Sequence, residues 1–291
     1  MSGPSAQLPH YRARSFRRGS RAYLVDERGR HWPSVTTVLQ ATKPQAQREA
    51  LARWRQRQGP ARAQRIAAQA SRRGTGTHAQ IRRYLRGQPP SCPEGVRPYW
   101  ESVQPVLAAI ERVQLVEGFV AHPQWQYGGR IDCIASYRST PCLCEWKTAD
   151  RPKGSVQRLY DAPLQLAAYW GAAWQCYRDC ALALEGALLV VALPEMPAEV
   201  FWFDRRELAA YWQQWQGRLH QFWQLPEPPS QGALRKAAGN ATEQAAGRNP
   251  AEGAAVGAVR RVLALNEAVP IGLHGRHALE QLQPLPLGVL H

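Results

Sequence analysis

Two short β-prone runs joined by a tight turn constrain this chain more than any other feature. Residues 129–137 and 141–147 carry Ile, Tyr, Trp and Cys, which are residue types that favour strands or buried positions. The turn-forming sequence Arg138-Ser139-Thr140-Pro141 separates the two runs, and its residues are common in turns. The pattern predicts an antiparallel β-hairpin.

Three charged residues interrupt the apolar runs. If the hairpin folds about Ser139-Thr140, Asp132 lies opposite Lys147 and Ile134 lies opposite Glu145. Side chains alternate between the two faces of a strand, so Glu145 and Lys147 share a face, and this register places Asp132 on the same face. Two carboxylates and an ammonium group in a buried strand are costly unless a cation joins them.

This group of charges predicts a metal site. Two carboxylates a few ångströms apart suit Mg²⁺ or Mn²⁺, which keep several waters when bound, and a neighbouring lysine can orient or deprotonate a metal-bound water. Such a set supports hydrolysis of a phosphodiester. The alternative is an exposed hairpin with a surface ion pair. The apolar neighbours favour a buried strand; they are Cys142, Leu143, Cys144 and Trp146.

The charge of the chain is concentrated in its first third. The net charge is +15 over 291 residues; residues 1–90 hold 19 Lys and Arg against 3 acids, residues 91–230 hold 12 against 15, and residues 231–291 hold 6 against 4. A basic segment next to an acid-bearing centre indicates a polyanionic partner such as nucleic acid. A nonspecifically basic surface is the alternative.

Cysteine spacing and hydropathy exclude other classes of protein. The six cysteines form no C-x-x-C pair, so we expect buried free thiols in a reducing compartment and no iron–sulfur cluster. No apolar run approaches a membrane span. The basic amino terminus resembles an organellar transit peptide, but we favour an arm that touches nucleic acid. We therefore expect a location in the organellar matrix if it is a transit peptide, and in the cytoplasm with the nucleoid if the protein is bacterial.

The remaining pattern predicts a mixture of helices and strands in which Ser34 caps the first helix. Asp161 and Asp204 are expected to cap two later helices. We predict a hairpin over residues 21–32, helices over 35–42, 45–58, 61–72, 79–85, 96–113, 162–177 and 205–223, and further strands over 115–127, 184–193 and 200–203.

Several residues outside the hairpin are candidates for the site. His78 follows Gly74-Thr75-Gly76-Thr77, where a break would place it in the first turn of a helix that favours an anion. It could also be a metal ligand, although the sequence alone favours a capping or surface role. Glu117 is a possible accessory acid or an exposed charge, and Gln165 and Tyr169 share a helix face.

The chain divides into three parts on composition. Residues 1–20 are predicted to be a flexible basic arm, and residues 21–230 to form one domain with a helical basic amino-terminal part. Residues 231–291 are rich in Ala, Gly and Gln, and we expect a low-complexity, disordered tail there.

Several of these motifs, taken in order, resemble those of the PD-(D/E)xK nuclease superfamily. They are Gly129-x-Ile131-Asp132, Glu145-x-Lys147-Thr148 and Gln165-Leu166-x-x-Tyr169. Within its RecB-type exonuclease branch, the chain is most similar to the mitochondrial genome maintenance exonuclease group. That group shares Pro33-Ser34-Val35-Thr36, Gly76-x-His78 and the stretch from Lys147-Thr148 to Pro163-Leu164-Gln165. The resemblance covers roughly residues 30 to 225.

The resemblance implies an α/β fold of the restriction-endonuclease type, with a mixed central β-sheet flanked by helices. It implies a Mg²⁺- or Mn²⁺-dependent DNA exonuclease that prefers single strands. Asp132 and Glu145 would hold the metal with the Trp146 carbonyl, and Lys147 would position the water. His78 would be an additional metal or phosphate contact.

The resemblance also extends to binding and orienting residues. Gln165 would orient Lys147 as part of the catalytic set, and the DNA backbone would be contacted by Ser34, Thr36, Arg72, Arg73, Lys153 and Tyr169.

Two positions depart from the pattern of the resemblance. Ile131 precedes the first acid where proline is common, and the second acid is Glu145 where the mitochondrial members tend to have aspartate. A glutamate still ligates a metal, so we expect activity. The alternatives are a structure-specific endonuclease on the same core and a catalytically silent nucleic-acid-binding module. The sequence leaves the oligomeric state open.

Overall fold

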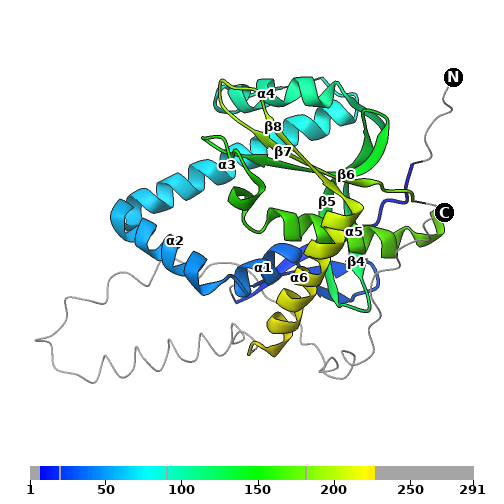
Figure 1. Ribbon diagram of the computed structural model, residues 1–291, viewed down its shortest axis with the longest axis horizontal. Coiled ribbons are helices and arrows are strands. Elements are labelled where there is room, and N and C mark those ends of the chain that lie inside the picture. Colours follow the sequence, from blue (N-terminus) through cyan, green and yellow to red (C-terminus); the bar gives the residue numbers. More distant parts are fainter. Residues whose placement is uncertain (1–6, 20, 90, 181, 227–291) are drawn as a thin grey trace, which may run out of the picture. The chain divides into compact units, whose positions relative to one another are not determined.

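A five-stranded mixed sheet forms the centre of the computed structural model, which describes residues 7–19, 21–89, 91–180 and 182–226. The strand order is β4-β5-β6-β7-β8 (Figure 1). Strands β6 and β7 are parallel, and the other neighbours are antiparallel. The strands are β4 (Ile110–His122), β5 (Tyr127–Tyr137), β6 (Thr140–Thr148), β7 (Gly186–Ala192) and β8 (Glu199–Asp204).

Helices cover both faces of this sheet and create two cores. One core packs α1, α5 and α6 against the sheet, and the other packs α3 and α4 against its opposite face (Figure 1). The helices are α1 (Val35–Ala41), α2 (Gln45–Gln58), α3 (Pro60–Leu85), α4 (Arg97–Leu107), α5 (Ala162–Cys176) and α6 (Arg205–Gln224). This arrangement is compatible with a restriction-endonuclease-like fold, and it confirms the predicted fold class. Strand β7 is buried along its whole length, as its continuous apolar sequence predicts.

Short elements complete the described part of the chain. Three strands form a separate sheet in the order β1-β2-β3, and an isolated parallel bridge joins Ser34 to Gly128 of the central sheet. The short elements are β1 (Ala13–Arg18), β2 (Arg21–Asp26), β3 (His31–Pro33) and the 3₁₀ turns η1 (Glu94–Val96), η2 (Val156–Leu159) and η3 (Arg178–Cys180).

Helix α3 differs from the prediction, because it runs without a break through Gly74 and Gly76. Gly76 serves close packing rather than helix termination, because a Cβ there would lie 2.5 Å from Val96 Cγ2. His78 is therefore in the interior of a long helix and not in a first turn. The predicted anion site at a helix amino terminus is wrong.

The hairpin register is also shifted from the prediction. Tyr137 pairs with Thr140 and Ile134 with Leu143, so Arg138 and Ser139 alone form the loop. Both loop residues have positive φ angles, 48° and 66°, as the type I′ turn of a two-residue hairpin requires. The register thus extends towards a pairing of Asp132 with Glu145, not with Lys147. A shift of two residues preserves the face of each paired side chain, but regular pairing stops at Cys133 and Cys144, before Asp132 and Glu145.

The segment that we expected to be a flexible basic arm is in part ordered. Ala13–Arg18 forms β1, Leu8 is buried, and the Leu8 amide donates to the Gln114 carbonyl at 3.0 Å. The segment therefore packs along the edge of β4. Residues 1–6 and the predicted tail over 231–291 lie outside the described residues.

One helix boundary and one cap differ in detail. Helix α4 ends at Leu107, so Ile110 begins β4 and does not extend the helix. Asp161 precedes α5 without capping it, because its carboxylate accepts from Arg218 Nη1 at 3.2 Å. The other predicted caps are confirmed: Ser34 accepts from the Thr37 amide, and Asp204 forms a capping box with Glu207. Within the described residues, no helix is long and apolar enough to cross a bilayer.

Candidate active site

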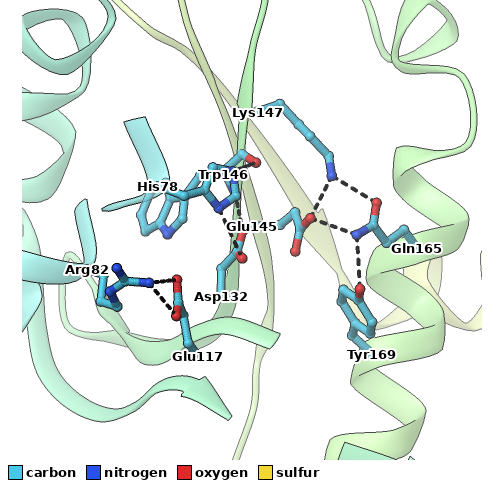
Figure 2. A network of polar contacts seen from close by, with 9 residues as sticks. All are labelled: His78, Arg82, Glu117, Asp132, Glu145, Trp146, Lys147, Gln165 and Tyr169. Atoms are coloured by element: carbon cyan, nitrogen blue, oxygen red, sulfur yellow. Dashed lines mark hydrogen bonds and ion pairs between the residues drawn. The ribbon is translucent and has the colours of Figure 1, made fainter. Parts of the chain in front are cut away.

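The predicted hairpin residues meet where strands β5 and β6 separate. Regular pairing ends at Cys133 and Cys144. Beyond this point, Asp132 Oδ2 accepts a hydrogen bond from the Trp146 amide at 2.9 Å. A side-chain carboxylate therefore takes the place of a backbone acceptor between the strands, and its second oxygen, Oδ1, lies 3.3 Å from His78 Nδ1 (Figure 2).

A compact polar network joins β6 to α5. Lys147 Nζ donates to Glu145 Oε1 at 2.6 Å and to Gln165 Oε1 at 2.9 Å. The amide nitrogen of Gln165 donates to Glu145 Oε1 at 2.8 Å and to the Tyr169 hydroxyl at 3.2 Å (Figure 2). Gln165 thus fixes both the acid and the lysine, and the predicted i, i+4 pairing of Gln165 with Tyr169 is confirmed.

Gly129 permits the position of Tyr169. A Cβ at Gly129 would lie 2.3 Å from Tyr169 Cε1, so only glycine allows the ring to pack against β5 here. Tyr169 is 5% exposed, and burial raises the pKa of its hydroxyl well above the usual value. It therefore acts as a neutral hydrogen-bonding group.

Glu145 is a buried carboxylate with one unused oxygen. The residue is 3% exposed, and its Oε2 atom has no hydrogen-bond partner. Burial, with the added charge of Asp132, raises the pKa of Glu145 to about 7 in spite of the neighbouring Lys147. An unpartnered oxygen in the interior is unfavourable for an isolated protein. Such sites often serve a ligand or a reaction.

His78 lies against two of the predicted ligands. From α3, its Nε2 atom is 2.9 Å from the Trp146 carbonyl oxygen, and its Nδ1 atom is 3.3 Å from Asp132 Oδ1 (Figure 2). Because a carbonyl oxygen can only accept, Nε2 is the donor. Burial lowers the pKa of His78, but the hydrogen bond and charge of Asp132 outweigh it, so the pKa lies above its ordinary value. His78 is therefore placed to neutralise and position these oxygens.

The structure brings Glu117 beside Asp132. Strands β4 and β5 pair on both sides of these two residues, but not at them. Glu117 has a φ of 53°, an uncommon conformation for a non-glycine residue that is often found at functional sites. Its carboxylate accepts from Arg82 Nη1 at 2.8 and 3.0 Å. Glu117 lines a small cavity together with His78, Asp132 and Trp146.

The site fits a hard divalent cation. Among the described residues, no group of three or more His, Cys, Asp or Glu side chains is arranged to hold an ion by side chains alone. The oxygen ligands of a cation would therefore include a backbone atom: they would be Asp132, the unpartnered Glu145 oxygen and the Trp146 carbonyl. Two carboxylates with a carbonyl and waters suit Mg²⁺ or Mn²⁺ rather than a softer metal.

A groove leads from Lys147 towards α1 and α2. We call it the lysine groove; it has a volume of about 820 Å³, and its lining includes Lys43, Lys147, Lys153, Trp54 and Tyr160. Lys153 lies over the Tyr160 ring at 5.8 Å, and Tyr160 is 68% exposed. Cationic groups beside an exposed aromatic ring are typical of single-strand nucleic-acid surfaces.

The predicted DNA-contacting residues are found in different settings. Thr36 and Lys153 line the lysine groove, while Ser34 is occupied as the cap of α1. Arg72 is exposed on α3. Arg73 is 15% exposed and pairs with Asp150 at 2.5 Å; its guanidinium group also stacks on Tyr99. Arg73 therefore joins α3 to the segment after β6, and its contact with DNA stays a prediction.

Sequence reasoning missed several residues at the site. Arg82 is one of many arginines in its helix, and only the continuous α3 shows that it lies one turn beyond His78. Lys43, Trp54 and Tyr160 line one groove although Tyr160 is more than 100 residues from the other two in the chain. An aromatic residue between two arginines, as at Trp54, is a pattern that could have indicated a nucleic-acid surface.

The chain is similar to three proteins named "Mitochondrial genome maintenance exonuclease 1". They are from Xenopus tropicalis (35% identical over 199 residues), Mus musculus (32% over 203) and Homo sapiens (31% over 199). Each similarity covers 65% of this chain but only 57–58% of the relative. The chain thus spans less than two thirds of the relatives that it matches. No family profile matches the chain. Identity at this level supports a relationship to a nuclease family.

Proposed function

We propose that this protein is a metal-dependent DNA exonuclease of the PD-(D/E)xK type that acts in genome maintenance. The observation that carries the proposal is the buried, unpartnered Oε2 atom of Glu145 beside Asp132 and Lys147. A buried carboxylate oxygen without a partner does not stabilise the fold, whereas a hydrolytic metal site uses such an oxygen as a metal ligand. The names of the similar proteins support the same activity.

The residues divide the chemistry among them. Asp132, Glu145 and the Trp146 carbonyl would hold the cation, and a bound Mg²⁺ or Mn²⁺ would neutralise phosphate charge and lower the pKa of a water. Lys147 would place its ammonium group beside the attacking water and the scissile phosphate. Gln165 keeps Lys147 beside Glu145, and positioning of this kind is worth several kcal/mol of barrier, about 7–11 at its limit.

The lysine groove supports a preference for single-stranded DNA. Trp54 and Tyr160 offer ring faces on which an unpaired base can stack, at about 1–3 kcal/mol per base. Lys43 and Lys153 offer charges for the backbone. A base within a duplex is already stacked on its neighbours and cannot use these rings.

Two other functions compete with this one. A structure-specific endonuclease would use the same residues, and degradation of a closed circular single strand would favour it. A binding module would bind DNA without cleaving it.

The relatives' names describe mitochondrial proteins, and we propose an organellar setting for this chain on that basis.

The deciding experiment is hydrolysis of a labelled single-stranded oligonucleotide. We expect cleavage from the ends with Mg²⁺ or Mn²⁺ and none in EDTA. Lys147→Ala should abolish cleavage and leave binding nearly unchanged, because Lys147 acts in the reaction. Wild-type-like cleavage by purified Lys147→Ala would overturn the assignment. Absence of cleavage by the wild type with either metal would favour the binding module.

A further inference from the structure

A second groove lies on the opposite side of the candidate active site from the lysine groove. It has a volume of about 690 Å³, and its basic lining residues are His10, Arg12, Arg14 and Arg130. We call it the arginine groove. Glu117 and Phe119 of β4 also line it. It is formed where the amino-terminal segment packs along the edge of β4.

Residues of neighbouring strands relate the two grooves to the site. Glu117 lines the arginine groove and also the small cavity that is lined by Asp132. Lys147 lines the lysine groove. Glu117 belongs to β4, Asp132 to β5 and Lys147 to β6, and these strands are neighbours in the sheet. The candidate site at β5 therefore lies between a strand that lines the arginine groove and a strand that lines the lysine groove.

The positive charges of the arginine groove are available to a ligand. Arg12, Arg14 and Arg130 are exposed, and none of them forms a salt bridge with an acid in the described part of the chain. Two of the three acids that line the groove are already occupied. Asp26 accepts from Arg30 and Trp32, and Glu117 accepts from Arg82.

The segment that carries two of these arginines is held in place. The Phe119 amide donates to the Tyr11 carbonyl at 3.4 Å, and the Tyr177 hydroxyl donates to the Pro9 carbonyl at 3.2 Å. The Tyr11 ring stacks on Tyr177 with centroids 5.7 Å apart. These contacts hold residues 9–11 against the core, so the backbone that leads into Arg12 is fixed in place.

We propose that the arginine groove binds the backbone phosphates of the nucleic-acid strand on the far side of the scissile bond from the lysine groove. This inference rests on the proposed function and extends it. The strand then lies across β6, β5 and β4 with the reacting phosphate at Asp132 and Lys147. Arg12, Arg14 and Arg130 hold the part beyond it.

The salt dependence of binding tests this proposal without using catalysis. Each phosphate contact that a single strand makes contributes about 0.7 to the slope of log K against log salt. Arg12→Ala/Arg14→Ala should therefore reduce the slope by about 1.4. The matched control is Arg97→Ala/Arg206→Ala, which removes two exposed arginines that line neither groove and should leave the slope unchanged.

The measurement is fluorescence anisotropy of a labelled single-stranded oligonucleotide in EDTA over a series of salt concentrations. Equal slopes for Arg12→Ala/Arg14→Ala and the wild type would overturn the inference, and so would an equal reduction in the control. Both results leave metal-dependent cleavage by the wild type, and with it the proposed function, unaffected. Loss of wild-type cleavage alone would refute the proposed function instead.

Discussion

Gly129→Ala is the most direct test of how the site is built. The new Cβ would lie 2.3 Å from Tyr169 Cε1, whereas carbon atoms in contact are about 3.5 Å apart, so the ring must move by about 1.2 Å. Tyr169 is buried and cannot swing into solvent. Excess volume of this kind in a packed core costs about 1–3 kcal/mol.

The same movement should reach the catalytic residues. The Tyr169 hydroxyl accepts from Gln165, and Gln165 holds both Glu145 and Lys147. A misplacement of about 1 Å in an active site can cost about 100-fold in rate. We therefore expect Gly129→Ala to lose most of its hydrolytic activity while it still folds.

Thermal unfolding and hydrolysis of a single-stranded oligonucleotide measure the two effects. A loss of about 1–3 kcal/mol corresponds to a fall in melting temperature of about 2–12 °C for a domain of this size. Gly217→Ala is the matched control, because nothing lies within 4 Å of a Cβ there; it should raise stability by up to about 1 kcal/mol. Wild-type stability and activity in Gly129→Ala would refute the reasoning.

A double-mutant cycle separates crowding from other causes. In a Tyr169→Ala background the ring is absent, so Gly129→Ala should cost little further stability. The coupling free energy between the two positions should then be about 1–3 kcal/mol. Additive effects would show that Gly129 matters for another reason.

Three further predictions concern other parts of the domain. Gly76→Ala should destabilise the protein by about 1–3 kcal/mol, because the new Cβ would clash with Val96. Gly74→Ala should instead stabilise α3 by about 1 kcal/mol, because the nearest atom to the new Cβ is 3.8 Å away. If chemical denaturation gave the opposite order of stabilities, it would contradict the continuous helix. Asp204→Ala should cost about 1 kcal/mol by removing the capping box of α6, and an unchanged denaturation midpoint would contradict it. Gln165→Met should fold and bind an oligonucleotide but lower the single-turnover rate by about 100-fold, so an unchanged rate would exclude its positioning role.

The sequence was informative where local patterns determine structure. The apolar run of β7 and the cap at Asp204 were each evident from a few neighbouring residues, and both are confirmed. The grouping of Asp132, Glu145 and Lys147 followed from strand alternation alone. An error of two residues in the register preserves the face of each paired residue, and Asp132, which lies beyond the last regular pair, is held near β6 by its bond to the Trp146 amide.

The failures arose where distant packing overrides local preference. Gly74 and Gly76 look like helix breakers, but α3 continues through both, and packing against Val96 requires a small residue at Gly76. The turn was misplaced because Arg138 and Ser139 are unusual residues for two consecutive positive φ angles. The pair of Arg73 with Asp150 was not predicted, because the two residues are 77 positions apart in the chain and no local pattern indicates it.

The continuity of α3 has a mechanical consequence. One uninterrupted helix holds Arg73 on Asp150, His78 on Asp132 and Arg82 on Glu117, over about 13.5 Å of helix axis at about 1.5 Å per residue. A rigid rod that makes three contacts along its length cannot release one without straining the others. A tilt or slide of α3 would therefore move Asp132, a proposed metal ligand, and Glu117, which lines the arginine groove, in a single movement, so we expect the helix to couple the two.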